Sequence, residues 1–306
     1  MIEFYFNILT TKIDMKKHSV ILLMVLLATS CFFYSCNNKM QPDTGKFVFD
    51  SLQVDRTEHL FGDTAKPSCN IRINLTSITG SDNENLKDSV NRYVLSLCLG
   101  EKYINQTPAE AVKNYAEAYV TNYRKDLEPM YQQESKEDTA SIGAWYSYYK
   151  GIEGHVQFYH KDLLVYRMDY NEYTGGAHGI YMTTYLNLNL ATLTPIRLDD
   201  LFVPNYKEAL TDLLWNQLMA DNHVATHEEL EDMGYTSTGE LVPTENFCLN
   251  PDGITFHYNI YEIAPYVMGA IQITLPYDAL SHLLNDETFL QNNVKKMRNT
   301  PLTPHF

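Results

Sequence analysis

The sequence predicts an α+β fold with mostly antiparallel sheets, a few packed helices and two intimately packed modules. Segments in which apolar and polar residues alternate with a period of two occur in runs, as expected for half-buried strands. The few helical patterns lie apart from these runs, and regular strand–helix–strand alternation is missing, which argues against a doubly wound fold. No glycine-rich loop with phosphate-binding spacing occurs.

The first half of the chain predicts two strands and then two helices. Residues 46–60 and 69–75 alternate and are expected to form strands. The first helix carries one apolar face and ends at a glycine; its residues are Leu86, Val90, Tyr93, Val94, Leu97 and Gly100. The second helix begins at the capping box Thr107–Glu110, with proline in its first turn, and is expected to end before Pro129.

From Ala144 onward the pattern indicates mainly strands. The expected strands are 145–149, 154–160, 163–170 and 181–190, followed later by 247–249, 254–258 and 270–275. Helices are expected after Pro204 and Pro276, and a weak one near Phe289. The acidic segment 221–239 is expected to be a helix end and a loop. The sequence Asn250-Pro-Asp-Gly253 predicts the turn of a hairpin.

The N-terminal segment has the pattern of a bacterial lipoprotein signal. A charged start at Met15-Lys-Lys precedes an apolar run of about ten residues, too short for a bilayer span of roughly 20 residues, and then two cysteines. Cys36 is the favoured lipidation site because cleavage at the alternative, Cys31, leaves aromatic residues beside the lipid. The expected product is exported and anchored to a bacterial membrane through its lipid alone.

The predicted organisation has four parts. Residues 1–36 form the signal region and 37–46 a tether, while 47–174 and 175–306 form two α+β modules. The chain is acidic, with 23 Lys and Arg against 38 Asp and Glu and a net charge of −15. Such a surface repels nucleic acid, which we exclude as a partner. The body contains Cys69, Cys98 and Cys248, which are expected to be small buried apolar residues.

The segment Tyr173-Thr-Gly-Gly-Ala-His178-Gly179 is the most distinctive internal motif. Gly175 and Gly176 permit backbone angles that other residues avoid, so they can turn the chain sharply between strands. Two interpretations stay open: a loop that presents His178 to a ligand, or a tight turn whose imidazole bonds to nearby backbone groups.

A second candidate segment is Ile260-Tyr-Glu-Ile-Ala-Pro-Tyr266. Glu262 lies between Tyr261 and Tyr266, which indicates either a tyrosine-lined recognition groove or a bulged strand over the core. His223 and His227 stand four residues apart, but Glu231 occupies the place of the second histidine in the zinc pattern His-Glu-x-x-His, so no metal site and no cofactor is expected. No serine or cysteine nucleophile motif is present, so no catalytic residue is assigned and a binding role is favoured over an enzyme.

Four motifs in order resemble a known family of extracytoplasmic domains. They are Gly175–His178, Leu198–Phe202, Pro251–Gly253 and Tyr261–Tyr266. The family is the domain of unknown function shared by RsiV, a lysozyme-sensing anti-sigma factor, and by the accessory region of the deacetylase PdaC. The similarity covers roughly 175–284, and 46–173 resembles the companion N-terminal module. No sigma-binding segment or deacetylase domain is found, so neither activity carries over.

The resemblance implies an envelope ectodomain that binds a protein or peptidoglycan ligand. The candidate ligand-binding residues are Tyr173, Gly175, Gly176, His178, Tyr261, Glu262 and Tyr266. A basic, lysozyme-like protein would suit the acidic surface. Two alternatives remain: a cell-wall hydrolase in which His178 and a carboxylate such as Glu262 act as acid and base, and a purely structural envelope lipoprotein.

Overall fold

The computed structural model describes residues 47–135, 144–285, 289, 290 and 293. All of them belong to one compact unit, Pro42–Phe306. The predicted signal region, the lipidation cysteines and the tether lie outside the described residues. The α+β fold with mostly antiparallel sheets is confirmed: one sheet has six strands and the other has three.

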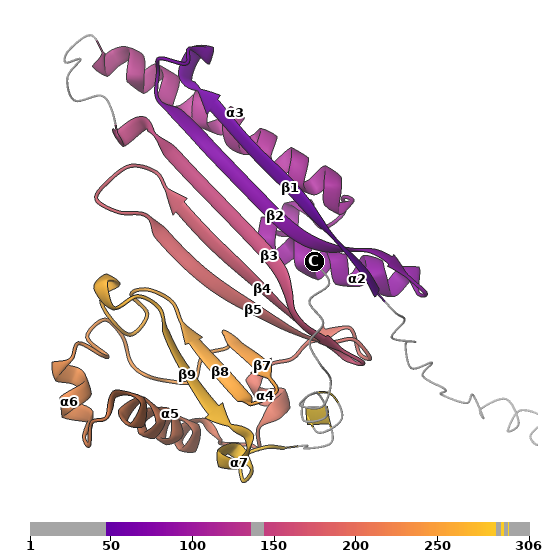
Figure 1. Cartoon of the computed structure of the whole chain (residues 1–306), viewed down its shortest axis with the longest axis vertical. Coiled ribbons are helices and arrows are strands. Elements are labelled where there is room, and N and C mark those ends of the chain that lie inside the picture. The colour runs from indigo at the N-terminus through magenta and orange to yellow at the C-terminus, as the bar shows by residue number, and fades with distance from the viewer. Residues whose placement is uncertain (1–46, 136–143, 286–288, 291–292, 294–306) are drawn as a thin grey trace, which may run out of the picture. The chain divides into compact units, whose positions relative to one another are not determined.

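The six-stranded sheet follows chain order, β1-β2-β3-β4-β5-β6 (Figure 1). Its strands are β1 (Phe47–His59), β2 (Ser68–Ser81), β3 (Tyr148–His160), β4 (Leu163–Tyr173), β5 (Ile180–Asn189) and β6 (Thr194–Pro195). All neighbours are antiparallel except β2 and β3, which run parallel. A parallel pair needs a long crossover, and α2 (Glu84–Leu99) and α3 (Pro108–Glu134) lie between these two strands in the chain.

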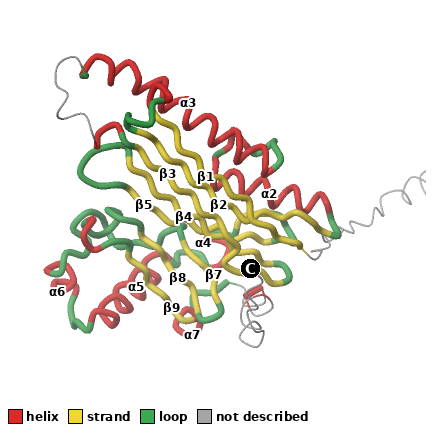
Figure 2. The backbone as a smooth tube through the Cα atoms, turned by 45° about the horizontal axis from the view of Figure 1, so that its top comes forward, coloured by secondary structure: helices red, strands yellow, loops and turns green. Residues whose placement is uncertain are grey.

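The two crossover helices lie along the six-stranded sheet and bury its apolar side (Figure 2). Ile71, Ile73 and Leu75 alternate along β2 and are fully buried in one cluster with Val112 and Val120 of α3. The predicted capping box opens α3: the Thr107 side chain accepts from the Glu110 N–H, and the Glu110 carboxylate accepts from the Thr107 N–H. The apolar pattern of both helices therefore packs as expected.

The second half of the chain builds the smaller sheet, β7-β8-β9. Its elements are α4 (Leu198–Leu201), α5 (Lys207–Asn222), α6 (His227–Asp232), β7 (Phe247–Asn250), β8 (Gly253–Tyr258), β9 (Ile271–Pro276) and α7 (Tyr277–Leu280). The predicted hairpin turn joins β7 to β8, where Asn250 Oδ1 accepts from the N–H groups of Asp252 and Gly253. Leu210, Leu214 and Leu218 of α5 are buried with β9 in one core.

Short 3₁₀ helices complete the described elements. They span Leu60–Gly62, Glu101–Tyr103, Ala144–Tyr146 and Tyr266–Met268. None of the helices in the described ranges has both the length and the apolar character needed to cross a membrane. Cys69, Cys98 and Cys248 are buried free thiols, which confirms that they act as small apolar residues.

The side chains of two asparagines connect the two sheets by hydrogen bonds to backbone groups. Asn187 of β5 is 3% exposed; its Nδ2 donates to the Phe247 carbonyl at 2.6 Å, and its Oδ1 accepts from the Leu249 N–H at 3.0 Å. Asn246 does the reverse, accepting from the Tyr185 N–H and donating to the Thr183 carbonyl. These amides satisfy strand-edge groups where no neighbouring strand does so.

The expected break between strands 145–149 and 154–160 is wrong. Trp145 lies in a 3₁₀ helix, and β3 runs without interruption through Gly151 and Gly154. Both glycines are needed for packing rather than for turns. A Cβ on Gly154 would lie 2.6 Å from Tyr166 Oη, and one on Gly151 would lie 2.6 Å from Asn171 Oδ1.

The ends of two helical segments also differ from the prediction. Helix α3 continues through Pro129 to Glu134 because Tyr131, beyond the proline, packs edge-on against Phe61 and Tyr146. Within the expected loop 221–239, residues His227–Asp232 form α6, which has its own capping box between Thr226 and Glu229. The predicted module boundary at 174/175 stays a prediction; it falls between β4 and β5, which pair in the same sheet.

Candidate functional site

The loop between β4 and β5 is a tight turn that is stabilised by a hydrogen bond between its own residues. Gly175 and Gly176 have φ angles of +86° and +102°, which glycine adopts far more readily than other residues. The Tyr173 hydroxyl donates to the Gly176 carbonyl at 2.9 Å, and Gly175 lies against the Trp145 backbone. The turn therefore fixes where His178, which is exposed, leaves the sheet.

The structure brings His178 together with the Tyr261–Tyr266 segment. The imidazole stacks on the Tyr266 ring with centroids 4.1 Å apart and an interplanar angle of 23°. Its Nε2 lies 3.3 Å from the Tyr261 hydroxyl. The two motifs, far apart in the sequence, thus form one surface; their role in binding stays a prediction.

Tyr261 adopts a backbone conformation that bulky residues avoid. Its φ is +68°, and its side chain is 48% exposed. A tyrosine held in the left-handed region is strained, and such strain is concentrated at functional sites. Downstream, the 3₁₀ helix Tyr266–Met268 follows Pro265 and exposes 90% of Val267.

Sequence reasoning missed Tyr181, which belongs to the same surface. Its ring lies 5.9 Å from the Tyr266 ring, centroid to centroid, in an edge-on arrangement, and the residue is 39% exposed. The signal was the run Ile180-Tyr-Met182, three large residues at the start of a strand. We refer to His178, Tyr181, Tyr261 and Tyr266 as the aromatic surface.

The carboxylate of Glu262 is directed to its own loop. It is exposed and accepts hydrogen bonds from the Asn259 backbone N–H at 2.9 Å and from Asn259 Nδ2 at 3.4 Å. In the described part of the chain, no carboxylate is hydrogen-bonded to His178. The pair of acid and base that the hydrolase hypothesis requires, about 2.6–3.2 Å apart, is thus not formed by these two residues.

A polar cluster around the buried His257 adjoins the aromatic surface. Asn259 Oδ1 accepts from the Thr183 N–H at 2.7 Å and lies 3.2 Å from His257 Nε2. Gln272 Nε2 lies 3.2 Å from His257 Nδ1. Burial of the imidazole lowers the pKa of His257. Asn259 therefore links the loop carrying Glu262 to β5, the strand that carries Tyr181.

The histidine pair near α6 takes a structural role. His227 stacks on Trp215 with centroids 4.0 Å apart, and His223 ends α5 in the left-handed conformation. Among the residues that the structure describes, no group of three His, Cys, Asp or Glu side chains is arranged to hold a metal ion.

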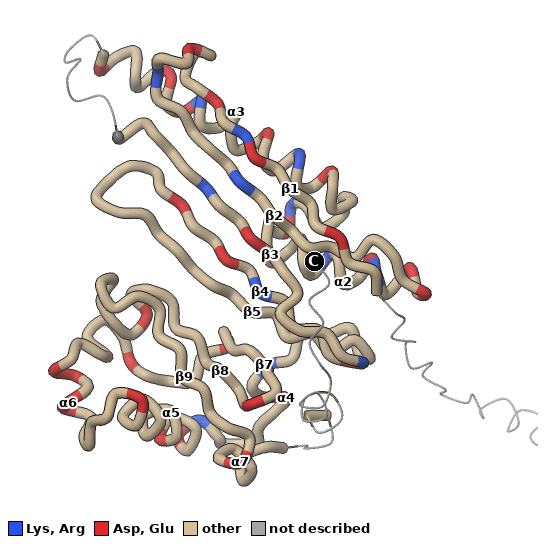
Figure 3. The backbone as a smooth tube through the Cα atoms, in the orientation of Figure 1, with Lys and Arg blue, Asp and Glu red and all other residues tan. Residues whose placement is uncertain are grey.

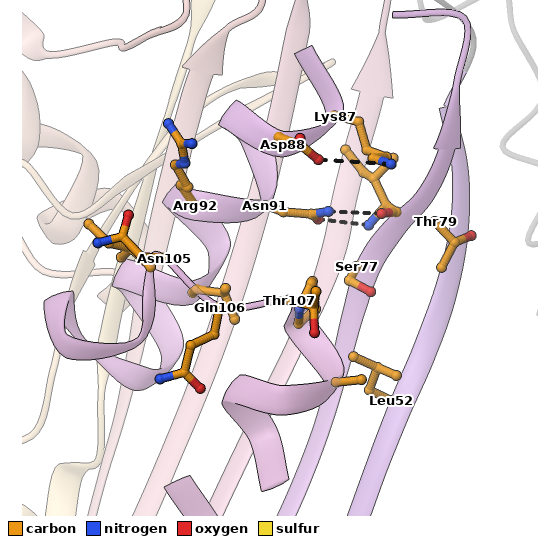
Figure 4. Close-up of a pocket in the computed structure, with 15 residues that line it drawn as sticks. Leu52, Ser77, Thr79, Lys87, Asp88, Asn91, Arg92, Asn105, Gln106 and Thr107 are labelled. Carbon is orange, nitrogen blue, oxygen red and sulfur yellow. Dashed lines mark hydrogen bonds and ion pairs between the residues drawn. The ribbon is translucent and has the colours of Figure 1, made fainter. Parts of the chain in front are cut away.

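Sequence reasoning also missed a cavity of about 470 Å³ beside α2 (Figure 4). It lies between α2, strand β2 and the start of α3. Its polar lining includes Ser77, Arg92, Asn105 and Gln106. No sequence motif marks it, because its walls come from three segments that the fold brings together.

Two family models match parts of the chain. Residues 199–278 match the family described as "Protein of unknown function (DUF3298)", and residues 63–181 match the one described as "Deacetylase PdaC". No protein with curated annotation matches the chain.

Two crystal structures of DUF3298 family proteins are similar to this structure. One, from Bacteroides fragilis, is 60% identical with a TM-score of 0.79, and the match covers 82% of this chain and 98% of that one. The other, from Pseudomonas aeruginosa, is 16% identical with a TM-score of 0.53, over 78% and 94% of the two chains. At this identity, the second structure shows similarity of fold alone.

Proposed function

The chain belongs to the DUF3298 family, and we propose that it is a non-enzymatic binding module of the bacterial cell envelope. Membership confirms the resemblance that the four ordered motifs predicted. The proposed ligand is a protein or a peptidoglycan glycan, and the aromatic surface is the proposed contact site. The proposed attachment to the membrane is a lipid on Cys36, or on Cys31, supported by the signal pattern in the sequence.

The observation that carries this proposal is the exposure of the aromatic surface. Tyr261 is 48% exposed and Tyr181 is 39% exposed, and Val267, which follows Tyr266, is 90% exposed. A contiguous exposed patch of this kind usually marks an interaction site. Tyrosine suits this role because its ring packs against apolar groups or sugar rings while its hydroxyl stays hydrogen-bonded.

The charge of the molecule favours a basic partner among the protein ligands. The net charge is −15, and Figure 3 shows acidic residues on the six-stranded sheet and on α6, whose six residues include four acids. Such a field attracts a basic protein, for which a lysozyme-like enzyme is the candidate, and it repels nucleic acid. A neutral glycan would instead bind through ring stacking and hydrogen bonds.

A pull-down with the chain from Asn37 to Phe306 tests the proposal. The immobilised chain is offered lysozyme and, separately, purified peptidoglycan at low and moderate salt. We expect one of the two to be retained, and Tyr261→Ala with Tyr266→Ala to abolish retention. Lysozyme retention should weaken as salt rises, because exposed charges are screened within about 10 Å at 0.1 M.

The matched control is Met130→Ala, which removes an exposed apolar side chain on α3. It should leave retention unchanged. The proposal is wrong if neither ligand is retained, or if the tyrosine variants retain as much as the unmodified chain while their thermal midpoints show that they are folded.

A further inference from the structure

The cavity beside α2 continues into a second one. The first has a volume of about 470 Å³ and the second about 290 Å³, and Arg92 and Ile104 line both. Together they follow one side of α2 from Ser77 of β2 to Leu193. The larger volume lies within the range of about 300–1,000 Å³ that is typical of small-molecule sites.

The fold creates this cavity where two strands separate. The parallel pairing of β2 with β3 ends at Leu75. Further along β2, Asn91 of α2 takes the place of a strand neighbour: its Oδ1 accepts from the Ile78 N–H at 2.9 Å, and its Nδ2 donates to the Ile78 carbonyl at 2.8 Å (Figure 4). The wall therefore has satisfied backbone groups and a fixed shape.

One hydroxyl that lines the cavity has no hydrogen-bond partner among the described residues. Ser77 is 3% exposed and lines the cavity, on the same side of β2 as the apolar residues that face the helices. Within the described ranges of the chain, its hydroxyl has no hydrogen-bond partner. The fully enclosed side-chain atoms without a partner in the described residues belong to Tyr119, Tyr146 and Asn171, so the Ser77 oxygen is reachable from the cavity and can bond to a ligand.

The charges in the lining favour one negative group on the ligand. Lys87 is already paired with Glu84 and Asp88. Arg92, which is exposed, forms no ion pair with any described residue, so its guanidinium can take a carboxylate. Asp88 and Glu101 also line the two cavities and would repel a densely charged group such as a phosphate.

The remaining lining groups suit a sugar. Leu52, Leu95 and Ile104 supply apolar contact, and Asn105 and Gln106 supply amides that can bond to hydroxyl and acetamido groups. We propose that this cavity binds a small saccharide with a single carboxylate, held by Arg92 and Ser77. The site is separate from the aromatic surface and does not depend on the function proposed for that surface.

The test compares two probes that differ in one group. N-acetylmuramic acid carries a carboxylate, whereas N-acetylglucosamine does not. Calorimetric titration of the chain from Asn37 to Phe306, which contains the whole compact unit, should show tighter binding of N-acetylmuramic acid. Arg92→Gln should weaken that binding about tenfold or more, as expected for a lost hydrogen bond to a charged group. Ser77→Ala should weaken both probes.

Two control variants make the outcome decisive. Lys113→Gln removes an exposed cation of α3 outside the cavity and should leave the affinity unchanged. Met130→Ala removes an exposed apolar side chain of α3 outside both cavities and should also leave it unchanged. Arg92 is exposed, so Arg92→Gln should keep the thermal midpoint. Absence of binding, equal binding of the two probes, or unchanged affinity in folded Arg92→Gln would overturn the proposal.

Discussion

His257 of β8 is a buried titratable residue where the two sheets meet, and its protonation affects the stability of the fold. It is 2% exposed, and both of its nitrogens face polar groups. Asn259 Oδ1 can only accept and Gln272 Nε2 can only donate, so the bonded imidazole is neutral with its proton on Nε2. Burial, together with the nearby Arg167 guanidinium, holds the pKa of His257 below its ordinary value of 6.5.

This lowered pKa predicts a loss of stability on acidification. Below pH 6.5, the ordinary pKa, the unfolded chain binds a proton at this position before the folded chain does. Protons then favour the unfolded state, so the His257 contribution is present above that pH and is lost as the pH falls through the window below it. Urea unfolding at pH 7.5 and pH 5.5 measures the change in the free energy of unfolding.

Other groups titrate in the same window, so the variant His257→Gln isolates this one. Glutamine keeps a donor and an acceptor but does not titrate near neutral pH. Its loss of stability between pH 7.5 and pH 5.5 should be smaller than that of the unmodified chain. Equal losses of stability in the two proteins would show that protonation of His257 is not coupled to unfolding.

Among the elements, α3 contains an unfavourable residue in its interior. Pro129 has no N–H to donate to the carbonyl four residues earlier, yet the helix extends to Glu134. Pro129→Ala restores that hydrogen bond, and we expect it to stabilise the protein by about 1–2 kcal/mol. Part of the gain is offset because alanine gives the unfolded chain more freedom. Thermal or urea unfolding measures the difference.

Met130→Ala provides the neighbouring control for this helix. Its side chain is 51% exposed, so the change should stay within about 0.5 kcal/mol. A lower midpoint for Pro129→Ala than for the unmodified chain would mean that the proline helps to set the direction of the last turn, where Tyr131 packs on Phe61 and Tyr146.

Short sequence motifs predicted correctly those elements that are stabilised by residues close to them in the sequence. The capping box at Thr107, the glycine after α2 and the turn at Asn250 each satisfy backbone groups a few residues away. The errors came from contacts that are distant in sequence. Gly154 resembles a turn residue, but it is small because Tyr166 and Cys98 lie against it. Likewise, the turn after Pro129 is held by aromatic residues of other elements.

At the scale of the whole molecule, the candidate surface was only partly predictable. Glycines and tyrosines marked the two segments, and the structure shows that His178 stacks on Tyr266. Tyr181 was missed because it lies beside Tyr266 only once the two sheets pack together. That packing is fixed by Asn187 and Asn246, whose side chains bond to backbone groups of the other sheet. No sequence pattern shows which backbone groups an asparagine will reach. The cavity beside α2 was missed for the same reason.

We propose that this protein meets its ligand at the aromatic surface. Hydrogen–deuterium exchange of the chain from Asn37 to Phe306, alone, with lysozyme and with soluble peptidoglycan fragments, tests it most directly. We expect slower exchange in residues 173–182 and 259–268 with at least one of these ligands. Unchanged exchange with both, or slower exchange confined to other elements, would contradict it.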